Sequence, residues 1–124
     1  MQRDIHAVNI RVEPEGSENK IGAEELDVIL AEAKAKLPRL VARYAKKMDV
    51  SYEKVFVKAQ KTRWGSCSSK GNINLNCLLM KVPPYVRKYV IVHELAHRKE
   101  MNHSEHFWKL VASEMSDYQK AVKW

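Results

Sequence analysis

The sequence predicts a small α+β protein, and three patterns point to this class. Apolar residues recur at steps of three and four between residues 23 and 48 and again after residue 84, which indicates amphipathic helices. Between residues 55 and 80, two short segments alternate apolar and polar side chains, as strands do. A length of 124 residues suits one domain. We place this domain at residues 23–124, with residues 1–22 as an N-terminal arm or weak strand.

The first part of the chain contains a weak strand signal and then a strong helical one. Residues 4–12 alternate apolar and polar side chains, and residues 13–22 have the polar, glycine- and proline-containing composition of a loop. The helical stripe that follows comprises Leu26, Ile29, Leu30, Ala33, Leu37, Val41, Tyr44, Ala45 and Met48. Pro38 lies within it. Because proline lacks an amide hydrogen, we expect Pro38 to end or kink the first N-terminal helix, and it can start a second one.

The face opposite this stripe is basic. Its positions at three- and four-residue steps are occupied by Lys36, Arg39, Arg43 and Lys47. The segment from Lys34 to Lys47 has no acidic residue, and the whole chain has a formal net charge of +7, which favours anionic partners. Two interpretations stay open: a solvated face, or contact with nucleic acid or another acidic partner.

A small β-sheet with a hairpin is expected at residues 55–80. A strand at Val55–Gln60 is followed by a turn-forming cluster centred near Lys70 and Gly71, and a second strand alternates from Ile73 to Cys77.

Arg63, Trp64, Gly65 and Ser66 precede this turn and are predicted to bind substrate. Glycine permits close backbone approach, and a strand at this place can lend hydrogen bonds to an extended substrate. The alternative is that Trp64 belongs to the core and that Gly65 marks a bulge. Cys67 has no second cysteine or histidine at ligand spacing, so a role as metal ligand or nucleophile is not favoured.

A further helix is expected at residues 84–101, started by Pro84. One stripe of this helix is formed by Val86, Val90, His93 and His97, which suits a helix packed in the interior. Asn102 tolerates a positive φ and is expected to stop the helix in the left-handed conformation. Ser104 can cap a C-terminal helix. The core-facing residues of that helix are Phe107, Val111, Met115, Tyr118 and Val122.

The segment His93-Glu94-Leu95-Ala96-His97 contains residues that are predicted to bind a metal and to catalyse a reaction. Histidines four residues apart project from the same helix face, and imidazole is a good zinc ligand. One further histidine would leave the fourth zinc position open, as in catalytic sites. We favour His103, which follows the expected chain reversal, while His106 in the first turn of the last helix is the alternative. His6 is remote in the sequence.

Glu94 borders the metal face of this helix. A zinc ion lowers the pKa of its bound water. Glu94 can hold that water, take its proton during attack on a peptide carbonyl, and hand the proton to the leaving amine. The predicted site therefore consists of one zinc ion held by His93, His97 and His103, with Glu94 as the catalytic base.

The composition limits where the protein is expected to act. The beginning of the chain lacks the apolar run of a signal peptide, and no apolar run approaches the roughly 18 residues of a membrane span. Two cysteines, Cys67 and Cys77, do not indicate a disulfide framework. A reduced, cytoplasmic setting is therefore the expectation.

Several motifs occur together between about residue 25 and Trp108. They are Thr62–Asn72, Asn76, Pro83-Pro84, Tyr89-Val90, His93–His97, Asn102-His103-Ser104 and Phe107-Trp108. This combination resembles the YgjP-like metallopeptidase family, which is similar in its core to SprT-like zinc proteases. The resemblance implies a compact zincin fold with helices around a small sheet whose edge lies beside the active-site helix. It also implies zinc at His93, His97 and His103, with Glu94 catalytic.

The chain departs from the family pattern in two places. Members usually carry a longer β-rich N-terminal part, so this chain looks like a shortened form. A large aromatic and a basic residue usually follow the position of Asn76, where this chain has Cys77 and Leu78.

The favoured function is a zinc-dependent peptidase. One alternative is a metal-dependent hydrolase of a non-peptide substrate. Another is a nucleic-acid-associated zinc protease that docks through the basic helix face. A binding module with a structural zinc is less well supported, because a structural site has no use for a carboxylate beside a water.

Overall fold

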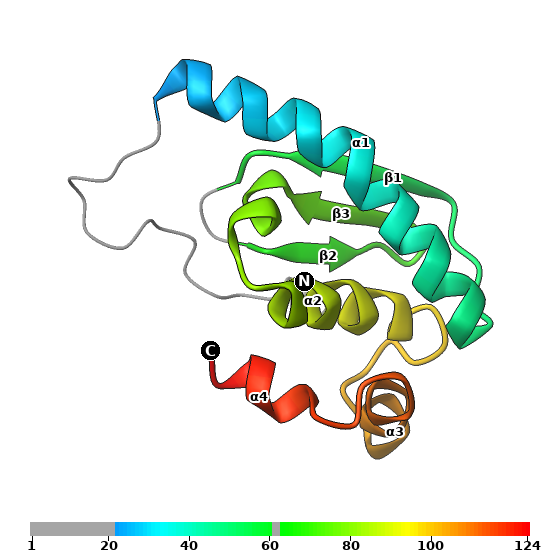
Figure 1. Cartoon of the computed structure of the whole chain (residues 1–124). Coiled ribbons are helices and arrows are strands. Elements are labelled where there is room, and N and C mark those ends of the chain that lie inside the picture. The colour runs from blue at the N-terminus through cyan, green and yellow to red at the C-terminus, as the bar shows by residue number, and fades with distance from the viewer. Residues whose placement is uncertain (1–21, 61–62) are drawn as a thin grey trace.

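The computed structural model describes residues 22–60 and 63–124, and its elements form the α+β arrangement that the sequence predicts (Figure 1). The strand expected at residues 4–12 lies outside the described residues. In chain order, the elements are α1 (Ala23–Met48), β1 (Lys54–Lys58), β2 (Gly65–Cys67), β3 (Asn72–Asn76), the 3-10 helix η2 (Cys77–Lys81), α2 (Pro84–Ala96), α3 (Glu105–Glu114) and α4 (Tyr118–Val122).

Helix α1 continues through Pro38, so the expectation of two N-terminal helices is wrong. Its buried stripe follows the predicted face and comprises Ile29, Ala33, Leu37, Val41 and Ala45. Proline inside a helix costs about 3 kcal/mol, whereas burying one large aliphatic side chain stabilises by about 1.5–3 kcal/mol. Because Leu37 and Val41 are fully buried on either side of Pro38, packing of the stripe outweighs the lost hydrogen bond.

The sheet has the strand order β1-β3-β2, with β1 parallel and β2 antiparallel to β3. The small sheet with a hairpin expected at residues 55–80 is confirmed, and the hairpin consists of β2 and β3. Strand β1 is not its first arm, and residues 77–81 form η2. The central strand carries Ile73 and Leu75, both at 0% exposure. Placing this apolar strand between two partners gives its side chains neighbours on both sides.

The turn between β2 and β3 forms where the sequence predicts it. Gly71 has φ 98°, a left-handed conformation that favours glycine, and its N–H donates to the carbonyl of Ser68 at 3.0 Å. A Cβ on Gly71 would lie 2.9 Å from Cζ of Arg98. Nε of Arg98 donates to the carbonyl of Ser51 at 2.8 Å. This arginine thus connects the end of the α2 region to the hairpin tip and to the loop after α1.

The helices form layers on one face of the sheet. Helix α1 packs against β1, α2 packs against β2 and β3, and the two helices contact each other. Helices α3 and α4 cover the side of α2 that faces away from the sheet (Figure 1). Every residue of α2 from Tyr89 to Ala96 is consequently buried. None of the helices in the described part of the chain combines the length and apolar character needed to cross a membrane.

The segment after α2 differs from the prediction. The helix ends at Ala96 rather than near Met101, and Asn102 has no left-handed backbone: Asp49 is the non-glycine residue with positive φ in the described part of the chain. Tight turns close the helix instead, with the N–H of Arg98 donating to the Leu95 carbonyl at 2.9 Å. Such turns satisfy terminal carbonyls without a left-handed residue.

The C-terminal region forms two helices rather than one. Ser104 caps α3 as predicted, because its Oγ accepts from the Phe107 N–H at 3.3 Å. Phe107 and Val111 are fully buried, but α3 ends at Glu114 and the chain bends before α4. Because of this bend the helical period is interrupted, and Val122, expected in the core, is 49% exposed.

Candidate metal centre

Three imidazoles meet beside the buried helix α2. His93 lies on this helix and His97 directly follows its last residue, one turn further along, and the chain then reverses so that His103 returns to them. Their nearest ligand nitrogens all lie within 4.8 Å of one another. The ring centroids are separated by 5.0 Å for His93–His97, 5.1 Å for His93–His103 and 4.8 Å for His97–His103. His93 and His97 are buried, and His103 is exposed, so one side of the cluster faces solvent.

The end of α2 orients His97. Its Nδ1 lies 3.0 Å from the carbonyl oxygen of Glu100. Because a carbonyl can only accept, the hydrogen belongs on Nδ1, which leaves Nε2 with a lone pair for a metal. The sequence does not indicate this role of Glu100, because a backbone carbonyl carries no sequence signal. Only the early end of α2 brings it back to His97.

Burial influences the charge of His93 and Glu94, which are buried polar residues of α2. Loss of water lowers the pKa of His93 to about 3, so the ring is neutral, as a metal ligand must be. Glu94 is fully buried, and burial raises the pKa of its carboxyl group well above the usual range. Its Oε2 lies 3.4 Å from Nδ1 of His93. Neither carboxyl oxygen has a hydrogen-bond partner among the described residues.

These groups fit a zinc ion. Buried polar atoms without partners are rare because each costs free energy, and here Nδ1 of His93 and both oxygens of Glu94 are in that state within the described residues. Three neutral nitrogen donors are the ligand set of many catalytic zinc sites, which keep one further position open. A cation and its water at this place would give the unsatisfied atoms partners.

One phenylalanine packs against the whole cluster. The ring centroid of Phe107 lies 5.0 Å from that of His93, 4.5 Å from that of His97 and 4.9 Å from that of His103. The sequence predicted Phe107 as a core residue through its helical period, but not that it would lie against all three imidazoles. An apolar ring here excludes water from one side of the nitrogens.

The predicted substrate segment runs along the edge of the sheet. Trp64 is 6% exposed and belongs to the core, while Arg63 and Ser66 are half-buried. Gly65 lies against α2: a Cβ there would be 3.1 Å from Cγ1 of Val90 and 3.3 Å from Cγ of Glu94. The glycine therefore allows β2 to approach the Glu94 side chain, and it pairs in register with β3 rather than marking a bulge.

The Asn76 side chain forms hydrogen bonds with the chain segment that leads into β2. Its Nδ2 donates to the carbonyls of Gln60 and Arg63, both at 2.8 Å, and its Oδ1 accepts from the Leu78 N–H at 2.9 Å. The side chain is fully buried. The alternation from Ile73 to Cys77 predicted only that Asn76 is a polar position of a strand. The sequence signal for a larger structural role is that Asn76 is one of the motifs shared with the resembling family.

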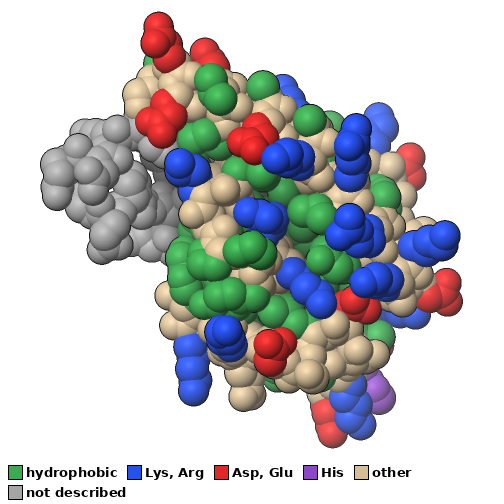
Figure 2. All heavy atoms as spheres, viewed as in Figure 1, with side chains coloured by type: hydrophobic (Ala, Val, Ile, Leu, Met, Phe, Trp, Pro, Cys, Tyr) green, Lys and Arg blue, Asp and Glu red, His purple; other side chains and the backbone are tan. Residues whose placement is uncertain are grey.

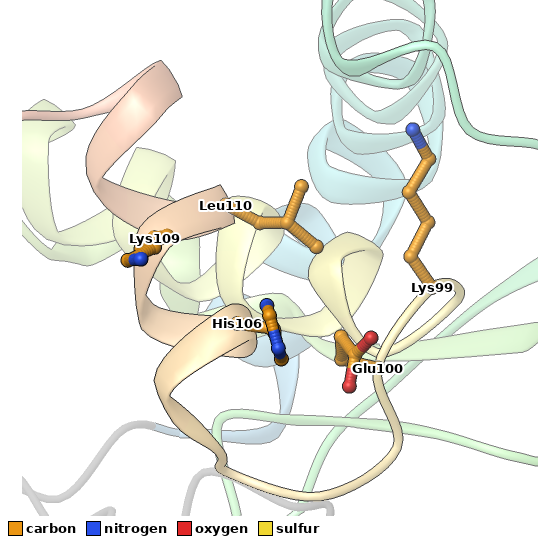
Figure 3. A pocket seen from close by; sticks show the side chains of 5 residues that line it. All are labelled: Lys99, Glu100, His106, Lys109 and Leu110. Carbon is orange, nitrogen blue, oxygen red and sulfur yellow. The ribbon is translucent and has the colours of Figure 1, made fainter.

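His106 lies apart from the cluster. It is exposed in the first turn of α3 and lines an open pocket of about 330 Å³ together with Lys99, Glu100, Lys109 and Leu110 (Figure 3). In the part of the chain that the structure describes, the group with metal-binding geometry contains His103 and not His106.

Cys67 is held as a neutral thiol. Burial, with the nearby Glu94 as a smaller cause, raises the pKa of Cys67 to about 12. Its Sγ donates to the carbonyl of Ser68 at 3.4 Å. A thiol in this state is neither a nucleophile nor a metal ligand at ordinary pH.

A small α+β domain with three gathered histidines is the arrangement expected of a zincin-like metallopeptidase. The profile described as "YgjP-like, metallopeptidase domain" matches residues 1–124, and the chain belongs to this family. A search of curated proteins found no match.

Two archaeal enzymes of known structure share the fold. The metallopeptidase zymogen abylysin of Pyrococcus abyssi is 21% identical, with a TM-score of 0.57 over 68% of this chain and 90% of that one. The metallopeptidase zymogen jannalysin of Methanocaldococcus jannaschii is 17% identical, with a TM-score of 0.59 over 71% of this chain and 94% of that one. The zincin-like fold implied by the sequence is thereby confirmed.

Proposed function

We propose that the protein is a zinc-dependent peptidase in which His93, His97 and His103 hold one zinc ion and Glu94 acts on the attacking water. The observation that carries the proposal is the Glu94 carboxyl group, which is buried without a hydrogen-bond partner among the described residues, next to three gathered imidazoles. A zinc ion at these nitrogens would supply a Lewis acid that polarises a substrate carbonyl and lowers the pKa of a water.

Glu94 would perform the proton transfers. Burial raises the pKa of its carboxyl group, and the charge of a bound zinc ion would act in the opposite direction and favour the carboxylate. The carboxylate would accept a proton from the water as the water attacks the peptide carbonyl, and the resulting carboxyl group would donate this proton to the leaving amine nitrogen. Helix α2 suits this task because it is packed on all sides, so the backbone that carries Glu94 has little freedom to move. Nδ1 of His97 is held by the Glu100 carbonyl, which keeps that ring in one orientation.

The peptide would bind along β2. Within the described residues this strand is at the edge of the sheet, and edge strands offer free N–H and C=O groups to an extended chain. The closeness of Gly65 to Glu94 supports this, because a peptide paired with β2 would pass beside the carboxylate. Arg63, Trp64, Gly65 and Ser66 are therefore proposed to form the substrate-binding segment, with Trp64 shaping it from the core.

The proposed base is tested with Glu94→Gln. The amide has nearly the same shape, so we expect the variant to fold and to keep its zinc, while casein hydrolysis falls by about 10²–10⁴-fold because the proton acceptor is lost. Zinc content by mass spectrometry and hydrolysis rates measure the two effects. Glu105→Gln is the matched control, because it removes an exposed carboxylate of α3 that pairs only loosely with Lys109, at 3.8 Å.

Two outcomes would contradict this mechanism. If Glu94→Gln keeps its zinc and cleaves casein at the wild-type rate, Glu94 is not the base. If the wild type binds zinc but cleaves no protein substrate, a hydrolase acting on a non-peptide substrate becomes the better interpretation.

A second candidate is a peptidase that docks on nucleic acid through the basic face of α1. Lys and Arg side chains gather over this part of the molecule with few acidic ones between them (Figure 2). Nζ of Lys47 lies 5.7 Å and Nζ of Lys88 5.5 Å from the ring centroid of Tyr44. Two ammonium groups close to one partly buried ring place positive charge together on this surface, which favours contact with phosphates.

The nucleic-acid proposal is tested by measuring the affinity for a DNA oligonucleotide at several salt concentrations. Each phosphate contact contributes about 0.7–0.9 to the slope of log affinity against log salt. Replacing Arg39 and Arg43 by alanine should therefore flatten the slope by between one and two, whereas Lys109→Ala, on α3, should not. A wild-type affinity that does not change with salt would exclude phosphate binding by this face.

A further inference from the structure

Three aromatic rings connect the third imidazole to the first. The ring of His103 stacks on Trp108 at 5.9 Å and 25° between planes, and Trp108 stacks on Tyr118 at 5.3 Å and 18°. Tyr118 stacks on Tyr89 at 6.5 Å and 14°, and Tyr89 meets His93 edge-on at 5.5 Å. We call Trp108, Tyr118 and Tyr89 the aromatic column. It starts and ends at imidazoles of the metal centre.

The three imidazoles are held in different ways. His93 and His97 lie at the buried end of α2, at 4% and 0% exposure, where helix geometry and packing fix them. His103 is exposed and belongs to the irregular segment between α2 and α3. A side chain on such a segment has more rotamers open to it, and each must be given up when it binds a metal.

Trp108 is placed to reduce this freedom. It lies in the first turns of α3, which Ser104 anchors, and is half-buried, so its indole offers a large and well-held face to the His103 ring. Tyr118, from α4, stacks on the same indole. Offset-stacked aromatic pairs are a favoured geometry, and groups that orient a metal-binding histidine change metal affinity.

We propose that Trp108 is a positioning residue for the third zinc ligand, and that Tyr118 braces it from α4. This inference rests on the proposed zinc site. It adds that the exposed part of this site is preorganised by ring stacking, so that α3 and α4 set the affinity for the metal although they carry none of the ligands.

The test compares zinc affinity, measured by competition with a chromophoric chelator, in the full chain. Trp108→Leu should weaken zinc binding by about 10-fold, while Trp108→Phe, which keeps a ring, should restore most of the affinity. Trp124→Leu is the matched control, because Trp124 is 52% exposed and contacts Trp64 rather than the metal centre. Tyr118→Leu should weaken binding by a smaller factor, and should add nothing in the Trp108→Leu background.

Cobalt(II) gives a second measurement that a general loss of stability would not alter. Its visible absorption depends on ligand geometry, so the spectrum of the Trp108→Leu protein should change while that of Trp124→Leu stays the same.

Wild-type zinc affinity and an unchanged cobalt spectrum in folded Trp108→Leu would overturn the inference and leave the zinc site standing. A wild type that binds no zinc would overturn both. If Trp108→Leu does not fold, Trp108→Met takes its place as the variant without a ring, and wild-type zinc affinity with an unchanged cobalt spectrum in that variant overturns the positioning. Unchanged zinc affinity in Tyr118→Leu overturns the bracing.

Discussion

At the residue scale, Gly65 shows how one missing side chain shapes the candidate site. The three atoms nearest to a Cβ placed there would be the carbonyl oxygen of Asn74 at 3.1 Å, Cγ1 of Val90 at 3.1 Å and Cγ of Glu94 at 3.3 Å. One of these is backbone of the neighbouring strand, and the other two belong to the helix with the proposed base. A methyl group at this point would have to separate the sheet from α2.

Gly65→Ala should therefore reduce both stability and activity. Overpacking a well-filled interior costs about 1–3 kcal/mol, and we expect this loss in the free energy of unfolding from urea titration. Hydrolysis should fall further than stability explains, because Glu94 is displaced. Gly22→Ala is the control, since a Cβ there has no atom within 4 Å. Equal activity of the two variants would mean that β2 does not need to approach Glu94 so closely.

At the scale of elements, the short segment between α2 and α3 arranges the site. Helix α2 ends at Ala96, the Glu100 carbonyl returns to His97, and Ser104 starts α3. Oγ of Ser104 accepts from the Phe107 N–H at 3.3 Å and donates to Oε1 of Glu100 at 3.4 Å. One hydroxyl group thus connects the residue that orients His97 to the helix that carries Phe107.

Ser104→Ala should destabilise the protein by about 1 kcal/mol, because an N-cap hydrogen bond is lost. Zinc affinity should decrease as well, because the first turn of α3 holds Phe107 against the imidazoles. Thermal unfolding and chelator competition measure the two effects. Ser113→Ala, at an exposed position inside α3, should change neither, and Ser104→Thr should recover most of the loss. Wild-type zinc affinity in Ser104→Ala would mean that the N-cap hydrogen bond of α3 does not contribute to metal binding.

At the scale of the whole molecule, the proposed metal centre joins residues from two layers of the fold. His93 and His97 come from the buried helix, and His103 from the segment that leads to the outer layer of α3 and α4. A ligand that binds the folded state and not the unfolded state stabilises folding in proportion to the logarithm of its concentration. A bound zinc ion should therefore stabilise the packing of these layers.

Removal of zinc with EDTA should lower the melting temperature by about 10 °C, as expected for roughly 2.7 kcal/mol at a metal concentration 100 times the dissociation constant. In His103→Ala this shift should largely disappear, whereas His106→Ala should behave like the wild type. Differential scanning fluorimetry with and without EDTA gives the comparison. If the shift disappears in His106→Ala and not in His103→Ala, the third ligand is His106 rather than His103.

Local sequence patterns were sufficient to predict several features of the fold. The stripe of α1, the turn at Gly71 and the cap at Ser104 were predicted, because each depends on residues within a few positions of one another. The helical spacing of His93 and His97 likewise follows from the backbone alone. What failed was the extent of elements: Pro38 did not end α1, and α2 stopped before Met101. In both cases packing against distant elements decided the boundary.

The sequence by itself determined the class of protein, the buried helix with its two histidines and carboxylate, and the family. Only the tertiary structure decided the strand order, the burial of Asn76 and the approach of Gly65 to Glu94. It also placed His103, which the sequence had favoured as third ligand, and the aromatic column beside the imidazoles of α2. The physical reason is that a repeat of 3.6 or 2 residues reports one face of one element, whereas these features depend on which faces meet when the core closes.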